Sequence, residues 1–277
     1  MLSIRDLIPK KKKDLARYRK FRSTLSRKGQ ELDYYRWLRK LAEESKVYFE
    51  KVVVERLAAH QFPNKKEFQK QFLTYYKQYK QLYGKRRTDA EIFTKVSKYM
   101  EAVESTQQRD FTKQFKKMGV GLDLANSDLL NKKYKEFLSV KIAENVAMVK
   151  ELTDRQSRRV SNQILTAYKH GFTQRDFAKI VQKEYGVTKS RAATIARTEI
   201  TKVTNSLSDA RASDVGCTEG FWRTMGDNRV SEGHSKLEGK RFKLSKGCWD
   251  PEVRKWVLPG RARPNCRCYT EYIVPED

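Results

Sequence analysis

The sequence predicts a mainly α-helical protein with an elongated helical N-terminal region and a small α+β module at its C-terminal end. Three observations support this fold class. Apolar side chains recur at steps of three and four residues through most of residues 31–213, as the buried face of a helix requires. After Gly216 this period gives way to short alternating stretches that are typical of strands. Hydrophobic residues are only 38% of the 277 residues and charged residues 34%, which favours extended helices over one large core.

The helical region is divided by glycines and capping residues. Gly84 is a predicted helix stop, and Thr88 with Glu91 forms a predicted capping box at the start of the next helix. Gly186 and Thr188 are predicted to separate two further helices. Stops are also expected at Gly171 and Gly216, and another cap at Thr173. The helices are predicted over residues 31–60, 65–83, 88–105, 129–150, 153–170, 173–185 and 188–213.

Residues 75–83 alternate tyrosines with lysines and glutamines. Stacking of nucleic-acid bases on these rings is one interpretation. Packing of an aromatic stripe against a neighbouring helix is the other, and we favour it because the rings recur at the helical period.

The C-terminal module contains the predicted strands. Gly226, Asp227 and Asn228 are turn-forming residues between them. We expect three parts in the chain: a basic arm over residues 1–30, a helical basic region over 31–150, and the module over 151–277. The strands are predicted over residues 221–225, 241–244, 255–258 and 268–274.

The chain carries 60 Lys and Arg against 34 Asp and Glu, a formal net charge of +26. Such an excess predicts contact with an anion, which can be nucleic acid, a phospholipid surface or an acidic protein. A solvated face is the alternative. We favour double-stranded DNA, because basic side chains at helical spacing match a phosphate backbone. The candidate DNA-binding residues in the N-terminal arm are Lys10, Lys11, Lys12, Lys13, Arg17, Arg19 and Arg22.

The sequence predicts neither a membrane span nor a secretion signal. No window approaches the roughly 18 apolar residues of a span, and no apolar segment follows the basic residues near the start. All four cysteines lie in the last quarter of the chain. Without a secretory context, we expect reduced thiols or a metal site rather than a disulfide framework.

His234, Cys248, Cys266 and Cys268 are the candidate metal ligands. One His and three Cys suit structural zinc, and a small module with little core would gain folding free energy from the ion. The Cys266–Arg267–Cys268 step is tighter than the spacing of most zinc modules, although alternation along a strand puts both thiols on one face. The alternative is that His234 caps a turn and the cysteines pack as small apolar residues.

Glu199 is a carboxylate on or beside the apolar stripe of its predicted helix, four residues from Ile195 and from Val203. A lone buried carboxylate is costly, so we expect a partner from the basic C-terminal turn. The favoured interpretation is a structural ion pair or a cap for the Asp227 turn. The functional alternative is a metal ligand or a general base.

The last half of the chain carries an ordered set of motif residues. The set comprises Ala196, Arg197, Thr198 and Glu199, then Trp222, Asp227, Arg229, His234 and Gly239, and finally Asn265, Cys266, Arg267 and Cys268. This set resembles the Mu F-like head morphogenesis (minor capsid) family of tailed phages, and the resemblance covers about residues 150–275. Some family members have a cysteine pair shortly after the Asp, where this chain has Ser231 and His234.

The resemblance implies a low-copy virion protein of the phage head interior that is made in the host cytoplasm. It implies portal protein and capsid or scaffold proteins as partners, and roles in head assembly, DNA packaging or DNA delivery. We expect no enzyme, because the sequence has no phosphate-binding glycine loop and no residues for the catalytic domains that some relatives add. Two alternatives stay open: a metal-dependent enzyme that processes nucleic acid with the His/Cys module, and a scaffold that does not bind DNA.

Overall fold

The computed structural model describes residues 20–117, 128–170 and 174–274. Two compact units are formed. Described residues from 1–31, 98–141 and 197–277 make the unit that we call the sheet unit, and residues 32–97 and 142–196 make the helical unit. No helix within the described ranges has the length and apolar character that crossing a membrane requires.

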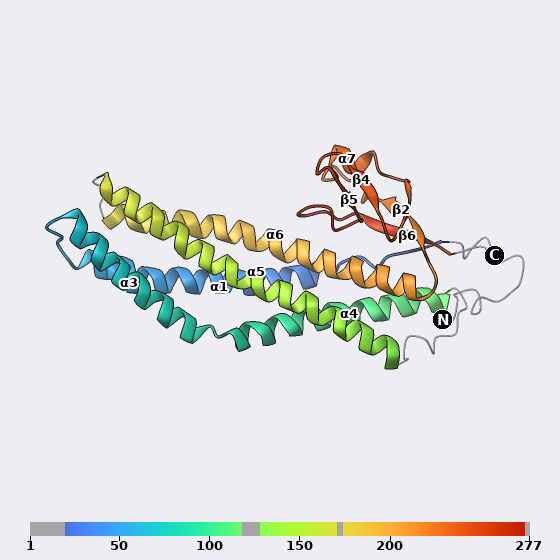
Figure 1. The fold of residues 1–277 in the computed structure, drawn as a ribbon, viewed down its shortest axis with the longest axis horizontal. Coiled ribbons are helices and arrows are strands. Elements are labelled where there is room, and N and C mark those ends of the chain that lie inside the picture. Colours follow the sequence, from blue (N-terminus) through green and yellow to red (C-terminus); the bar gives the residue numbers. More distant parts are fainter. Residues whose placement is uncertain (1–19, 118–127, 171–173, 275–277) are drawn as a thin grey trace, which may run out of the picture. The chain divides into compact units, whose positions relative to one another are not determined.

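Helices dominate the structure and a small sheet region lies in the C-terminal part, which confirms the predicted fold class (Figure 1). A π-helical turn, η3 (Glu50–Val54), joins the first two helices. The α-helices that precede the C-terminal strands are α1 (Lys28–Phe49), α2 (Glu55–Ala58), α3 (Lys65–Arg86), α4 (Asp89–Lys117), α5 (Asp128–Lys169) and α6 (Gln174–Asp214).

Several predicted helix boundaries are wrong, because glycine and threonine do not interrupt these helices. Helix α3 runs through Gly84, and α5 is continuous where a break near residue 151 was predicted. Helix α6 runs through Gly186 and Thr188, and the Thr188 hydroxyl donates to the Glu184 carbonyl at 2.8 Å instead of capping a new helix. A glycine costs a helix only about 1 kcal/mol relative to alanine, which packing of a long helix offsets.

Other predicted boundaries are confirmed. Thr88 Oγ1 accepts from the Glu91 amide at 3.2 Å and Glu91 Oε2 accepts from the Thr88 amide at 3.2 Å, the reciprocal pattern of a capping box. The helix that this box begins extends beyond the expected residue 105 to Lys117. Gly216 ends α6 with φ +91°, which allows the Cys217 amide to donate to the Ala212 carbonyl at 3.0 Å. The stop predicted at Gly171 and the cap predicted at Thr173 lie outside the described residues.

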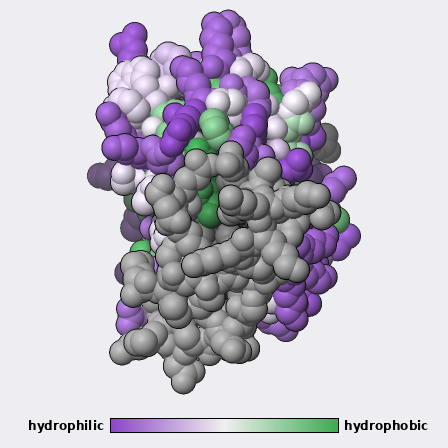
Figure 2. Space-filling view, turned by 90° about the vertical axis from the view of Figure 1, so that its right-hand side faces the viewer, coloured by the Kyte–Doolittle hydropathy of each residue, from purple (hydrophilic) through white to green (hydrophobic). Residues whose placement is uncertain are grey.

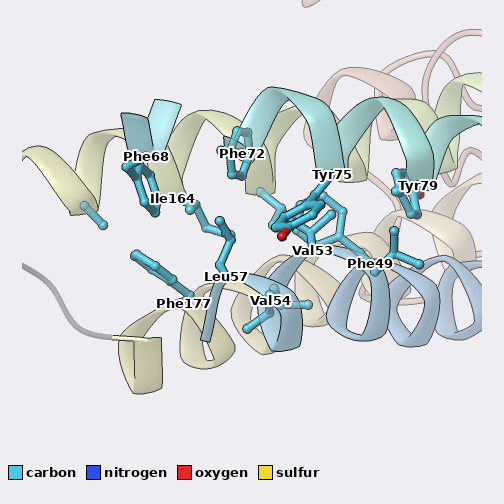
Figure 3. Close-up of a cluster of buried hydrophobic side chains, with 14 residues drawn as sticks. Phe49, Val53, Val54, Leu57, Phe68, Phe72, Tyr75, Tyr79, Ile164 and Phe177 are labelled. Carbon is cyan, nitrogen blue, oxygen red and sulfur yellow. The ribbon is translucent and has the colours of Figure 1, made fainter. Parts of the chain in front are cut away.

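A buried cluster of the helical unit combines aromatic and aliphatic side chains, and one face of α3 supplies many of the aromatic ones (Figure 3). Tyr75 and Tyr79 are 7% and 1% exposed, and the Tyr79 hydroxyl lies 2.8 Å from Ser45 Oγ. Packing of the aromatic stripe is therefore confirmed, because buried rings cannot stack on bases. The labelled side chains that pack together here are Phe49, Val53, Val54, Leu57, Phe68, Phe72, Tyr75, Tyr79, Ile164 and Phe177.

The sheet unit contains an antiparallel four-stranded sheet and a separate two-stranded one. The larger sheet has the order β1-β6-β2-β3, and β4 pairs only with β5. Sequence analysis missed β1, β4 and the short helix α7. The bounds are β1 (Lys20–Arg22), β2 (Glu219–Arg223), α7 (Glu232–Ser235), β3 (Arg241–Lys243), β4 (Cys248–Asp250), β5 (Lys255–Val257) and β6 (Tyr269–Ile273).

Strand β1 comes from the segment that we expected to be a basic arm. Phe21 anchors it, with its ring centroid 5.9 Å from that of Phe111 and 4.9 Å from that of Tyr272. Arg22 lies on this strand and is exposed. The other candidate DNA-binding residues, Lys10–Lys13, Arg17 and Arg19, lie outside the described residues, so their assignment stays a prediction.

Candidate metal centre

Three of the predicted metal ligands meet in the sheet unit. His234 lies on α7, whose N-cap Ser231 accepts a hydrogen bond from the His234 amide at 3.4 Å. Cys266 and Cys268 lie just before β6, and both thiols face His234 Nδ1. All three side chains are buried, at 3%, 7% and 3% exposure respectively.

The distances between the donor atoms fit a small tetrahedral ion. His234 Nδ1 is 3.6 Å from Cys266 Sγ and 3.5 Å from Cys268 Sγ, and all three donor atoms lie within 4.8 Å of one another. Zinc bonds of about 2.3 Å to sulfur and about 2.0 Å to nitrogen at a tetrahedral angle separate those donors by about 3.6 Å. The imidazole and thiolate donor set and its spacing therefore both fit zinc.

Asp250 orients the histidine, and sequence analysis did not single it out. Its carboxylate is fully buried on β4, with Oδ2 3.0 Å from His234 Nε2 and Oδ1 accepting from the Glu252 amide at 2.9 Å. A carboxylate on the far nitrogen of a ligating histidine holds the ring and directs the other nitrogen to the metal. No periodicity or spacing marks Asp250, because the hairpin that carries it is defined only by tertiary packing.

Proton affinities in this cluster reflect the same contacts. Burial alone would lower the pKa of His234, but hydrogen bonds with Cys266 and Asp250 outweigh burial and raise it. The hydrogen bond with Cys268 lowers the pKa of Cys266, against the effect of burial, and His234 lowers it further. The same hydrogen bond raises the pKa of Cys268, so a bound cation would have to displace the protons that Cys268 and His234 hold.

Cys248 and Glu199 do not join this group. Cys248 is buried in the same hydrophobic cluster as Cys266 and Cys268, but its thiol is not part of the donor group. Glu199 is 4% exposed, and its Oε1 lies 2.9 Å from Lys202 Nζ on the next turn of α6. The partner is thus on the same helix and not on the C-terminal turn, where we expected it.

Arg197 and Thr198 fasten the loop that carries the cysteines. Arg197 Nη1 donates to Asn265 Oδ1 at 3.0 Å, and Thr198 Oγ1 accepts from the Asn265 amide at 3.0 Å. Asn265 has φ +59°, a left-handed conformation that asparagine tolerates better than most residues. Residues far apart in the sequence thereby set the start of the Cys-x-Cys segment.

Asp227 connects the turn after β2 to the same segment. Arg267 Nη2 donates to both of its carboxylate oxygens at 2.6 and 2.7 Å, and Arg229 Nη2 donates to Oδ2 at 3.0 Å. These contacts lower the pKa of Asp227 to about 2, with Arg267 as the main cause.

Gly239 takes φ +72°, so a residue with a side chain would be strained there.

A pocket of about 90 Å³ lies over the cluster. Its wall includes His234, Cys266 and Cys268 together with Arg229, Arg263 and Arg267. Thiol hydrolases also place a cysteine, a histidine and a carboxylate in successive contact, as Cys266, His234 and Asp250 are here. In those enzymes the one thiol serves as the nucleophile. Here two thiols face one nitrogen at nearly equal distance, which favours a metal centre over a nucleophile and its base.

Comparison with known proteins finds a family match that covers the residues of this site. Residues 158–271 match the family model described as Phage Mu protein F like protein. The resemblance inferred from the motif residues is thus confirmed over this segment.

A relative from Haemophilus influenzae, described as an uncharacterized protein, is 27% identical over 148 residues. The alignment covers 53% of this chain, which spans about a third of the relative's length (32%). No solved structure matches the chain.

The first prediction concerns the ligand set. We expect the purified protein to hold about one zinc ion per chain, because the donor atoms of His234, Cys266 and Cys268 lie close enough together to bind one ion. His234→Ala and Cys266→Ser should each lose the ion in elemental analysis. Cys248→Ser is the matched control and should keep it. Loss of the ion from Cys248→Ser would instead support the four-ligand set predicted from the sequence, and an ion-free wild-type protein would exclude the site.

Proposed function

We propose that this protein is a phage minor head protein that associates with the portal protein in the head interior, is made in the host cytoplasm, and acts in head assembly and DNA packaging or delivery. The Mu F-like segment over residues 158–271 carries this proposal. We further propose that the chain binds double-stranded DNA without sequence preference, and the net charge of +26 supports this part. Capsid or scaffold proteins are the other expected partners.

Helix α3 offers the clearest described surface for binding phosphates. It contains seven Lys and Arg but only one acidic residue, Glu67. Its aromatic face is buried, whereas Lys66, Lys70 and Lys77 are exposed at spacings of four and seven residues, which keep them near one face. The exposed lysine face of α3 can follow a phosphate backbone without reading bases. Figure 2 shows another side of the molecule, where most of the described surface is also hydrophilic.

The second prediction tests DNA binding. We expect the full chain to bind a short DNA duplex with an affinity that falls steeply as salt rises, because binding releases counterions. The triple variant Lys66→Ala, Lys70→Ala, Lys77→Ala should weaken binding and reduce the slope of log K against log salt by about 0.9 for each phosphate that the variant no longer neutralises. Fluorescence anisotropy at several salt concentrations measures both quantities.

Two further variants make this measurement decisive. Lys179 and Lys236 are paired with Asp176 and Glu232, so alanine at both positions should change the slope less than the triple variant. Alanine at Lys10–Lys13 tests the predicted arm in the same assay. Absent binding at low salt, or binding that does not depend on salt, would contradict the DNA proposal.

Portal association requires a separate test. Pull-down of the portal protein of the same phage, with and without nuclease treatment, separates a protein contact from bridging by DNA. Retention after nuclease together with failed DNA binding would favour the alternative of a scaffold whose charge meets an acidic protein surface.

A second candidate function is a metal-dependent enzyme that processes nucleic acid. The His234–Cys266–Cys268 group supports this candidate, because it could hold the metal ion that such an enzyme requires. The geometry favours a structural ion instead, because the donors are buried and Glu199 is paired with Lys202 outside the group. A plasmid nicking assay with added divalent metal discriminates the two. Cleavage that is lost in His234→Ala would support the enzyme, and intact plasmid would support the structural ion.

A further inference from the structure

The β4–β5 hairpin places two tryptophans side by side on its outer face. Trp249 and Trp256 are directly opposite in the antiparallel pair, with ring centroids 6.1 Å apart and an interplanar angle of 67°. They are 47% and 51% exposed, whereas the flanking Cys248 and Asp250 are 5% and 0% exposed. Alternation along β4 therefore buries the side that supports His234 and leaves the indoles in solvent.

Basic side chains lie beside this pair. Lys246 Nζ lies 3.9 Å from the centroid of the Trp256 ring, and Arg254 is exposed in the turn before β5. The acidic residues of the hairpin are already engaged, since Asp250 contacts His234 and Glu252 pairs with Arg263. The outer face of the hairpin is thus apolar at its centre and cationic at its edge, as in a protein interface with aromatic anchors and a polar rim.

The arrangement of the rings distinguishes between two kinds of occupant. A nucleic-acid base stacks on an open, parallel ring face. Here the two indoles meet edge to face, which covers part of one ring, and the Lys246 ammonium lies over the Trp256 ring. A protein segment does not need parallel ring faces, because apolar side chains can fill the angle between the indoles while carboxylates reach the surrounding cations.

We propose that Trp249, Trp256, Lys246 and Arg254 form a docking surface for an acidic segment of a partner protein. Apolar side chains of that segment cover the two indoles, and its carboxylates pair with Lys246 and Arg254. This inference deepens the proposed function, because it names the surface through which the chain contacts another head protein. It does not depend on DNA binding or on a metal ion.

The test titrates the full chain with a short synthetic peptide that alternates glutamate with leucine, and follows the indole N–H resonances by NMR. Two control ligands are a peptide of equal charge with serine in place of leucine, and a single-stranded oligothymidine. We expect the glutamate–leucine peptide to shift the Trp249 and Trp256 resonances and to bind more tightly than the serine peptide.

Trp249→Ala and Trp256→Ala should each weaken peptide binding by about tenfold, as expected for aromatic anchors. Phe93→Ala is the matched control, because Phe93 is 53% exposed but belongs to the helical unit, and it should leave the affinity unchanged. All of these side chains are half-exposed, so the variants should keep the unfolding midpoint of the wild type.

Equal binding of the leucine and serine peptides, or tryptophan-dependent binding of the oligonucleotide alone, would overturn the proposal. The portal pull-down separates it from the proposed function. If the portal binds wild type and the Trp249→Ala variant equally, the docking surface is wrong but the association stands. If the peptide binds through the tryptophans and the portal does not bind, the association fails and the surface stands.

Discussion

Trp222→Ala is expected to lower the free energy of unfolding by about 3–5 kcal/mol, the usual cost of removing a large buried aromatic side chain. Trp222 is fully buried on β2, with its ring centroid 5.1 Å from that of His234 and 6.5 Å from that of Phe242. Its removal opens a cavity beside the donor group, so zinc content should fall along with stability. Urea unfolding followed by circular dichroism measures the change.

Trp249→Ala is the matched control for this variant, because it also removes an indole from the sheet unit. Trp249 is 47% exposed, and surface substitutions of this kind usually change stability by about 0.5 kcal/mol or less. Similar losses in the two variants would contradict the packing described for Trp222.

Asp209→Asn is expected to cost about 2–4 kcal/mol, because it leaves the positive charge of Arg261 without its counterion in a mostly buried position. Asp209 lies on α6, where it pairs with Arg261 and accepts a hydrogen bond from the buried Tyr272 hydroxyl at 2.6 Å. Burial lowers the pKa of Arg261, which shows the same lack of solvation. Asparagine keeps the size of the side chain, so the loss of stability reports on charge.

The double variant Asp209→Asn, Arg261→Met tests that explanation. Removing both charges should recover much of the stability lost in the single variant, since neither side chain is then buried as an unpaired ion. Tyr272→Phe isolates the hydrogen bond and should cost about 1 kcal/mol. If the double variant is less stable than the single one, packing of Arg261 is more important than its charge.

Sequence periodicity predicted the helices well and their boundaries poorly. The repeat of apolar residues specifies which face of a helix is buried, so α1, α3 and the aromatic packing of Tyr75 and Tyr79 followed from it directly. The predicted break at Gly186 was wrong, because a local preference of about 1 kcal/mol is smaller than the packing free energy of a long helix.

Strand β1 shows a different kind of failure. Lys20, Phe21 and Arg22 carry no strand pattern beyond one buried ring, and their pairing partner β6 lies about 250 residues later in the chain (Lys20 opposite Ile273). Short edge strands are specified by the partner that they meet, so a single sequence offers little from which to predict them.

The residue types of the candidate site were readable from the chain, because imidazole and thiol groups are scarce and concentrate near its C-terminal end. The family likeness and the positive charge were readable for the same reason: both follow from composition and from the order of residues. Selection among the candidates was decided only by tertiary structure. Folding gathers His234, Cys266 and Cys268, leaves Cys248 outside their group and brings Asp250 behind the histidine. Coordination and hydrogen bonding act over a few ångströms, and spacing along a chain does not determine such distances once loops and separate hairpins intervene.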